Sequence, residues 1–511
     1  MKRWTQGCIS MLCLATSLWS FSGCSSDEDL PENPEISRPS QPGVDEYTYR
    51  PVEYRKWQNG SFQPWTTQDS RETRTIDGMN WFHPAVHAAQ TVWGGRTDLQ
   101  LTSVVGKEGF FRVATCEGRS FLLDPDGGAF LIHGIQHVRP GSSVAQQQAV
   151  QRKFGSLGRW SEETGRLLVD NQFNYISYGS KRAEAFPAET RLALLSPASQ
   201  QIAYAENLYL LRSFMWDMHQ NLGYTFEDDK YNRLVLLFEP TFASYIDELI
   251  REKSLLFVGD KHFIGYYLDN ELPFASYQDK DPLRGIDLKH FLSLPDRYKS
   301  ARLFAEQFMH DRQILMIEAI TPHHQEEFRG RVADYYFQLT TSTLRRYDTD
   351  HLILGARLHD WSKYNQQVVE ACARYCDVVS INYYARWQPE QDFLAKLDAW
   401  CGAKPFLISE FYVKAADAGY DGKPYSNTEG GGWLVRNQQH RGAFHQNFCL
   451  RLLESRRCIG WVHFEYNDTP DVNKGIVSLD YEPYEPYLKL VRQLNQQVHA
   501  LVDYYDKRKN K

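Results

Sequence analysis

The sequence predicts an α/β protein built as a (β/α)8 TIM barrel, with a small β-rich cap at its N-terminal side. Short β-rich runs recur along the chain, several of them almost continuously apolar, as parallel strands buried on both faces are. Each run is followed by a helical pattern, and eight such alternations over about 380 residues match a barrel with loop insertions. A doubly wound open sheet is the alternative, although no Gly-x-Gly-x-x-Gly turn follows any early strand.

The expected barrel occupies residues 129–506. Its helices are indicated by apolar residues at helical spacing, for example over 245–250 and over 487–502 in the last helix. The eight strands are expected at Ala129–Val138, Phe173–Gly179, Leu208–Met218, Phe263–Glu271, Leu352–His359, Val378–Tyr384, Pro405–Tyr412 and Ile459–Tyr466.

The residues before the barrel divide into three parts. Residues 1–23 are expected to be a signal peptide, residues 24–45 a flexible tether of Ser, Pro, Glu and Asp, and residues 46–128 a cap packed on the barrel. Within the cap, 110–115 and 120–123 predict a β-hairpin, and the Asp-Pro-Asp-Gly sequence at 124–127 predicts a tight turn into the barrel.

The signal peptide ends in a sequence that resembles a bacterial lipobox. Lys2 and Arg3 precede an apolar stretch, 9–21, which is too short to span a membrane. Phe-Ser-Gly then leads to Cys24, which in a lipobox becomes the lipidated first residue; a plain signal peptide with a chance Cys is the alternative. The acidic run after it resembles the export signal of Bacteroidetes-type surface lipoproteins. We therefore expect a lipid anchor at Cys24 in the outer membrane, at the cell surface or on its periplasmic side.

Composition excludes some functions. The 511 residues carry a formal net charge of −7, without the basic excess typical of nucleic-acid binders. Aromatic residues make up 14% of the chain, which excludes a disordered protein and provides rings for a core or for sugar faces. Six Cys remain after the lipobox, singly placed in mostly apolar runs, so buried free thiols are expected, with disulfides left open.

Two Glu residues lie where expected strands end. Glu271 follows the fourth strand and Glu410 ends the seventh, and such strands lie across the barrel mouth from each other. Glycoside hydrolysis needs one carboxyl to protonate the leaving oxygen and another on the opposite side of the same bond. The positions therefore indicate a glycosidase, which requires no cofactor and no metal.

The strand ends resemble the retaining (β/α)8 glycoside hydrolases of clan A, and within them the β-agarase and β-galactosidase-like branch. The resemblance covers roughly residues 120–505. It rests on Asn270-Glu271 and Glu410 together with the stretches Gly265–Pro273, 354–357, Ser409–Phe411, Gly460–Tyr466 and Gly475–Val477 leading to Tyr484.

The resemblance implies roles for individual residues. Glu271 is the expected acid/base and Glu410 the nucleophile, with carboxyl groups about 5–5.5 Å apart in a retaining enzyme. Asn270 is expected to bind the sugar 2-hydroxyl, Tyr384 to hold Glu410, and Trp461 to form the platform under the sugar. Tyr383 is the competitor of Tyr384, and Trp461 can instead be core.

The sequence departs from the clan at the second strand, where many members carry an Arg. Here the strand end is Tyr-Gly-Ser-Lys at 178–181, and Arg357 is a candidate for the same work. Further candidates for substrate binding are strand-end residues that have structural alternatives: Asn382, His137, Tyr412 and Glu465, with Asp269 and Arg139 beside them. A Gly-rich loop, 417–433, is expected either to close over the site, with Tyr420, Tyr425 and Trp433 as walls, or to be an ordinary surface loop.

The expected activity is hydrolysis of β-linked, galactose-containing oligo- or polysaccharides such as agar or porphyran, by double displacement. The alternatives are the same chemistry on another β-glycan or glucuronide, and a non-catalytic glycan-binding surface lipoprotein. A carbohydrate and, through the anchor, the membrane are the expected partners; no nucleic acid is expected, and the sequence leaves the oligomeric state open.

Overall fold

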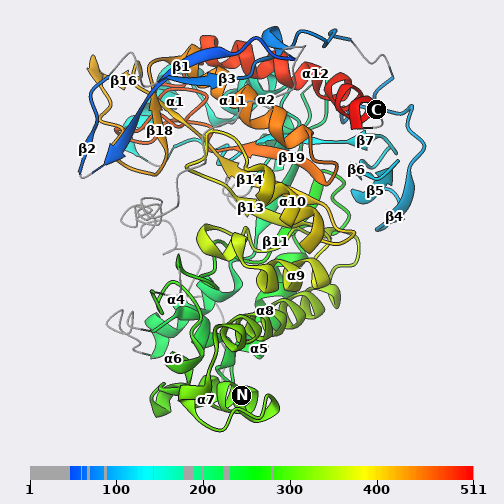
Figure 1. Ribbon diagram of the computed structural model, residues 1–511. Coiled ribbons are helices and arrows are strands. Elements are labelled where there is room, and N and C mark those ends of the chain that lie inside the picture. Colours follow the sequence, from blue (N-terminus) through cyan, green and yellow to red (C-terminus); the bar gives the residue numbers. More distant parts are fainter. Residues whose placement is uncertain are drawn as a thin grey trace.

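The computed structural model describes residues 46–58, 60–65, 70–85, 89–141, 143–177, 188–197, 199–222, 231–277 and 280–509 (Figure 1). The predicted signal peptide and tether, including Cys24, lie outside these ranges. Within them, no helix combines the length and the apolar character that a bilayer crossing requires.

A sheet of eight strands, all paired in parallel, forms the centre of the molecule, in the order β12-β11-β10-β9-β8-β19-β14-β13. The sheet closes because Leu358, just beyond β12, pairs in parallel with Ile381 of β13. The predicted (β/α)8 barrel is thus confirmed. Its strands are β8 Ile132–Ile135, β9 Tyr175–Ile176, β10 Ala203–Asn207, β11 Phe263–Tyr267, β12 Leu352–Ile353, β13 Val379–Asn382, β14 Phe406–Phe411 and β19 Cys458–His463.

Helices surround the barrel, and several of them, such as α2, α5 and α9, bury one apolar face. Side-chain caps satisfy amide groups at several of their N-termini, for example Ser156 on α2 and Asn365 on α9. The helices are α1 Val144–Phe154, α2 Leu157–Asp170, α3 Ala188–Leu195, α4 Leu210–Leu222, α5 Phe242–Ser254, α6 Leu288–Leu292, α7 Lys299–Asp311, α8 Pro322–Arg345, α9 Gln366–Tyr375, α10 Gln391–Trp400, α11 Gln438–Leu453 and α12 Glu485–Lys509.

Seven of the eight expected strands contain a barrel strand, and the third expectation is wrong. The run 208–218 forms helix α4, and the strand is β10, just before it. Leu210, Leu211, Phe214 and Met218 are buried at helical spacing, so the run is one face of a helix, not a strand buried on both faces. The strand in the structure, Ala-Tyr-Ala-Glu-Asn, is too polar to match the apolar pattern of a strand buried on both faces.

Residues before the barrel take part in two further sheets. In the first, β1 (Arg50–Gln58) pairs with β2 (Ser61–Phe62) and β3 (Ser70–Thr73), and also with β18 (Trp433–Val435) from the loop after β14. β18 in turn pairs with β15 (Lys414–Ala415). In Figure 1 this sheet lies beside α11 and α12 at the top of the view. The N-terminal region is therefore joined to the barrel through a shared sheet.

The second of these sheets contains a hairpin over the residues where one is expected. It is a four-stranded sheet of β4 (Thr102–Val105), β5 (Arg112–Cys116), β6 (Arg119–Leu123) and β7 (Ala129–Phe130). β5 and β6 are the arms of the hairpin, and a turn at 124–127 leads to β7. The six cysteines in the described ranges are all free thiols, five of them buried, as expected.

Candidate active site

The two predicted catalytic carboxylates lie at the same end of the barrel, in different surroundings. Glu271 follows β11, and its Oε1 accepts a hydrogen bond of 2.7 Å from Nδ2 of Asn382 at the end of β13. Ser409 in turn donates to Oδ1 of Asn382 at 2.8 Å, which fixes the orientation of the amide. The Glu271 side chain is 19% exposed, whereas that of Glu410 is 6% exposed.

Glu410, on β14, is held by three donors. The guanidinium of Arg357 and the amide of Gln136, at 3.1 Å, both donate to Oε1, and the hydroxyl of Tyr384 donates to Oε2. A carboxylate that accepts several hydrogen bonds, one of them from a cation, is stabilised in its ionised form. The contact with Tyr384 is the one predicted for it.

Arg357 links both strand-end motifs. Its Nε donates to Oδ1 of Asn270 at 2.8 Å while its Nη2 contacts Glu410, and its guanidinium lies 5.0 Å from the centre of the Tyr267 ring. Arg357 thus lies beside both Asn270 and Glu410, as expected of the arginine that many clan members carry. It comes from just beyond β12, whereas theirs comes from the second strand. Residues 178–181 lie outside the described residues.

Several of these residues have left-handed backbone conformations. Glu271 has φ of 53°, Arg357 of 52°, His137 of 56° and Ala385, directly after Tyr384, of 53°. Such conformations are costly for residues with a Cβ and concentrate where the surrounding structure enforces a particular side-chain direction. Their clustering at the strand ends supports a functional site there.

Three aromatic rings line the site beside Glu410. Tyr384, Tyr412 and Phe464 form a separate cluster, with the Tyr384 and Tyr412 rings 5.1 Å apart. The ammonium of Lys474 lies 5.0 Å from the Tyr412 ring centre and 5.4 Å from that of Phe464. Rings of this kind offer an apolar face with polar groups around it, which suits a sugar.

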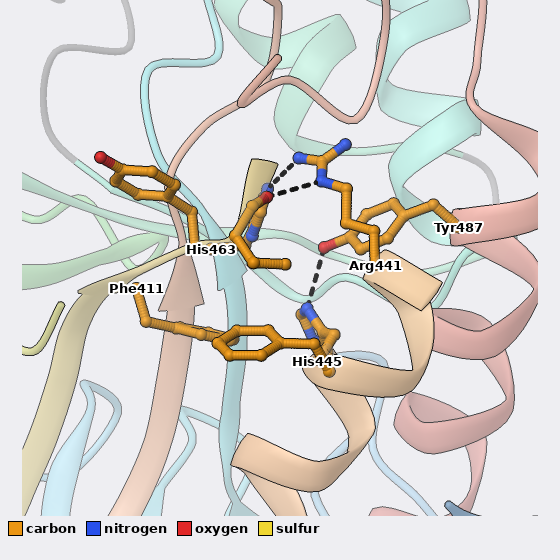
Figure 2. A pocket seen from close by; sticks show the side chains of 8 residues that line it. Phe411, Arg441, His445, His463 and Tyr487 are labelled. Carbon is orange, nitrogen blue, oxygen red and sulfur yellow. Dashed lines mark hydrogen bonds between the residues drawn. The ribbon is translucent and has the colours of Figure 1, made fainter. Parts of the chain in front are cut away.

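The predicted platform, Trp461, lies elsewhere. Only 1% of it is exposed, and it belongs to the main hydrophobic core. Side chains alternate along a strand, so Trp461 shares a face of β19 with His463, which contacts Arg441, His445 and Tyr487 of α11 and α12 (Figure 2). Trp461 therefore faces the helical layer, and the aromatic ring of this strand end that reaches the site is Phe464.

His137 and Glu465 form a buried pair at the ends of the first and eighth strands. Nδ1 of His137 lies 2.7 Å from Oε2 of Glu465. Burial lowers the pKa of His137. Burial alone would raise the pKa of Glu465, but the hydrogen bond and the charge of His137, together with the charges of Lys474 and Arg139, outweigh it, so the pKa is lowered. Glu465 is thus held as a carboxylate by His137.

Asp269, next to the Asn270-Glu271 motif, is structural. It accepts hydrogen bonds from the backbone of Leu211 at 2.9 Å and from Tyr336 at 2.9 Å, and it is 1% exposed. It therefore holds the N-terminus of α4 against the barrel. Burial raises its pKa to about 6.

The Gly-rich loop reaches the site through its backbone. Gly430 has a φ of 74°, and a Cβ there would overlap the hydroxyl of Tyr412 and the ammonium of Lys474, so the position favours glycine. Trp433 instead packs against Tyr54, with ring centres 5.2 Å apart. Tyr425 clusters with Ala418 and Leu479, away from the Tyr384 cluster.

Sequence reasoning missed three residues at the site. Gln136 donates to Glu410, Phe464 joins the aromatic cluster, and His359 Nδ1 lies 3.9 Å from Oε1 of Glu271. Gln136 precedes His137 in the sequence, and Phe464 precedes Glu465; both neighbours were predicted to bind substrate. The alternation of faces along a strand was the signal that could have found Gln136.

Comparison with known proteins supports the assignment of class. No protein-family model matches the chain. Among curated proteins, the chain is similar to β-agarase B of Vibrio sp. (strain JT0107), with 21% identity over 479 residues, covering 77% of this chain and 48% of that protein. The chain thus spans about half the length of this curated relative.

Solved structures share the fold over most of the chain. BpGH50 superposes with a TM-score of 0.75 and 27% identity, covering 90% of this chain and 96% of that one. The agarase AgWH50C, with a TM-score of 0.61 and 19% identity, and an exo-β-agarase, with 0.63 and 17%, share the fold over 82% of this chain and 67% and 68% of their own. The predicted resemblance to agarase-like glycoside hydrolases is therefore confirmed.

Proposed function

We propose that the protein is a retaining glycoside hydrolase that cleaves β-linked galactans of the agar type. The observation that carries the proposal is the pair Glu271 and Glu410 at one barrel mouth, in environments that suit opposite roles. Galactan as the substrate is supported by the agarases among the similar proteins.

Glu410 is suited to act as the nucleophile. Arg357, Gln136 and Tyr384 keep its carboxylate ionised and fixed. In the first step, a Glu410 oxygen forms a bond to the anomeric carbon as the bond to the leaving oxygen breaks, giving a glycosyl-enzyme.

Glu271 is suited to move the proton. Asn382 donates a hydrogen bond to Oε1 of Glu271, which holds the carboxyl at the barrel mouth, within reach of a leaving oxygen. Glu271 gives its proton to the leaving oxygen in the first step. In the second it takes a proton from the water that attacks the anomeric carbon, and the Glu410 carboxylate leaves.

The test is digestion of agarose, porphyran and non-galactan β-glycans, such as mannan and glucan, with product sizes read by chromatography. We expect oligosaccharide products from a galactan, and loss of nearly all turnover in Glu271→Gln and Glu410→Gln. Turnover of another β-glycan or a glucuronide alone would reassign the substrate. Binding of glycans without any turnover would make the protein a surface glycan-binding protein and would refute the proposal.

The lipobox-like sequence supports a second proposal, that the enzyme is anchored in the outer membrane through Cys24. A Cys24→Ser variant expressed in a Gram-negative host should lose radiolabelled palmitate and leave the membrane fraction. Membrane association that survives the change would refute the anchor without affecting the catalytic proposal.

A further inference from the structure

Two buried amide side chains at the barrel mouth each keep one hydrogen-bonding group without a partner among the described residues. They are Oε1 of Gln136, just after β8, and Nδ2 of Asn207, at the end of β10. Gln136 is 0% exposed and Asn207 is 6% exposed. Buried polar groups are nearly always satisfied, so an exception at a functional site indicates a group that is satisfied by a ligand.

The orientation of Gln136 follows from its neighbour. Its Nε2 donates to Oε1 of Glu410 at 3.1 Å. The opposite orientation of the amide would place a carbonyl oxygen against a carboxylate oxygen, which is repulsive. The hydrogen bond of Nε2 to Glu410 therefore also fixes the position of Oε1. This accepting oxygen lies next to the proposed nucleophile, where a substrate would bind.

The orientation of Asn207 is fixed as well. Its Oδ1 accepts a hydrogen bond of 2.8 Å from the backbone of Tyr209, so the amide nitrogen is the group left over. In the register of β10 with β11, Asn207 pairs with Tyr267, whose ring packs against the guanidinium of Arg357. Paired residues of neighbouring parallel strands point to the same side of the sheet, so Asn207 shares the inner face with Tyr267.

We propose that Gln136 and Asn207 are substrate-binding residues, each contacting a hydroxyl of the bound saccharide, Gln136 as acceptor and Asn207 as donor. The inference rests on the proposed function and deepens it. A hydroxyl group both donates and accepts, so one chemical group satisfies both orphaned atoms. They come from the first and third strands, whereas the two proposed catalytic carboxylates come from the fourth and the seventh.

This arrangement has a consequence for substrate choice. The Gln136 oxygen lies beside an ionised carboxylate, and both repel an anion. The sugar that is bound next to Glu410 must therefore present a free hydroxyl to Gln136. A sulfate ester at that hydroxyl is excluded, because it removes the donor and adds charge.

The test compares wild-type protein with Gln136→Met, a variant of similar volume that lacks both amide groups. Substrates are an aryl β-galactoside and its monodeoxy analogues, and kcat/KM is measured for each. In the wild type, the analogue that lacks the contacted hydroxyl should lose about tenfold, the worth of one buried hydrogen bond. In Gln136→Met, the same analogue should lose less than about twofold, because the partner is already gone.

A second variant and a control separate this contact from structural damage. Asn207→Asp keeps the acceptor for Tyr209 and removes the donor, and it should show the same coupling with a different deoxy analogue. Asn495→Leu removes a buried amide on α12, whose Oδ1 likewise has no partner in the part of the chain that the structure describes. This control should show no coupling with any analogue.

The outcomes distinguish the inference from the function. Turnover of the parent galactoside, with every deoxy analogue losing the same factor in wild type and variants, overturns the inference alone. In that case Gln136 only positions Glu410. Absence of galactoside and galactan turnover in the wild type overturns the proposed function, and the inference with it.

Discussion

Arg357 is the residue whose removal most directly tests how the site is assembled. It is fully buried, and it contacts Glu410 through Nη2 and Asn270 through Nε. Replacement by Met keeps much of the side-chain volume and removes the charge and the donors. Glu410 then remains buried with two neutral donors, Gln136 and Tyr384.

Two magnitudes follow for Arg357→Met. Removal of one partner from a buried ion pair costs about 3–5 kcal/mol in the free energy of unfolding, because the remaining charge is left uncompensated. Loss of a preorganised donor from a catalytic centre lowers kcat by about 10²–10³-fold. Arg357→Lys should recover part of the stability but little of the activity, since an ammonium cannot bridge Asn270 and Glu410 as a fork does.

The assay measures urea unfolding and galactan turnover on the same preparations. Arg119→Met is the matched control. Arg119 lies in the cap hairpin, is 1% exposed and donates hydrogen bonds of 2.8 Å to both carboxylate oxygens of Asp506. The control should lose stability and keep kcat at temperatures where it is folded. If Arg357→Met kept kcat within about twofold of wild type, the reasoning on the electrostatics of Glu410 would be refuted.

Three further predictions follow. Asn382→Ala removes the 2.7 Å hydrogen bond to Glu271 and should lower kcat about tenfold on oligosaccharides. The loss should be smaller on nitrophenyl glycosides, because their leaving groups need no proton. Equal losses on both substrates would contradict a proton-transfer role for Glu271. Trp461→Phe should lower the melting temperature without changing KM, whereas Phe464→Ala should raise KM; the reverse pattern would return the platform role to Trp461. Burial raises the pKa of Asp269 from 3.8 to about 6, so its protonated form stabilises the fold below pH 4, and this stability is lost as pH rises through 6. Asp269→Asn should therefore make the free energy of unfolding depend less on pH between 4 and 6. An unchanged pH dependence would contradict the shift.

The sequence was most informative where strands are buried on both faces. Runs such as 263–267 and 406–411 are short and, apart from Ser409 and Glu410, apolar, and they are barrel strands in the structure. Such runs differ from buried helix faces only in length and spacing, so the helix over Leu210–Leu222 was predicted as a strand. The short polar strand at Ala203–Asn207 is determined by its neighbours on both sides, which a local pattern does not contain.

Part of the candidate site could be predicted from the sequence, and part depends on side-chain directions that the sequence does not specify. The order of strands places Glu271, Arg357, Tyr384 and Glu410 at one end of the barrel, so their proximity could be predicted from the sequence. Which strand-end ring faces the site depends on the face of β19: Trp461 lies in the main core, whereas Phe464 clusters with Tyr384 and Tyr412. The partner of each polar group, such as Gln136 for Glu410, depends on side-chain directions at the barrel mouth.

The central claim is that Glu410 forms a covalent bond to the sugar during turnover. The most direct measurement is mass spectrometry of the intact protein and its peptides after incubation with an activated 2-deoxy-2-fluorogalactoside. The account predicts one added fluorogalactosyl group, located on the peptide that contains Glu410 and absent from Glu410→Gln. A label on another residue, or galactan turnover by a protein that never becomes labelled, would contradict it.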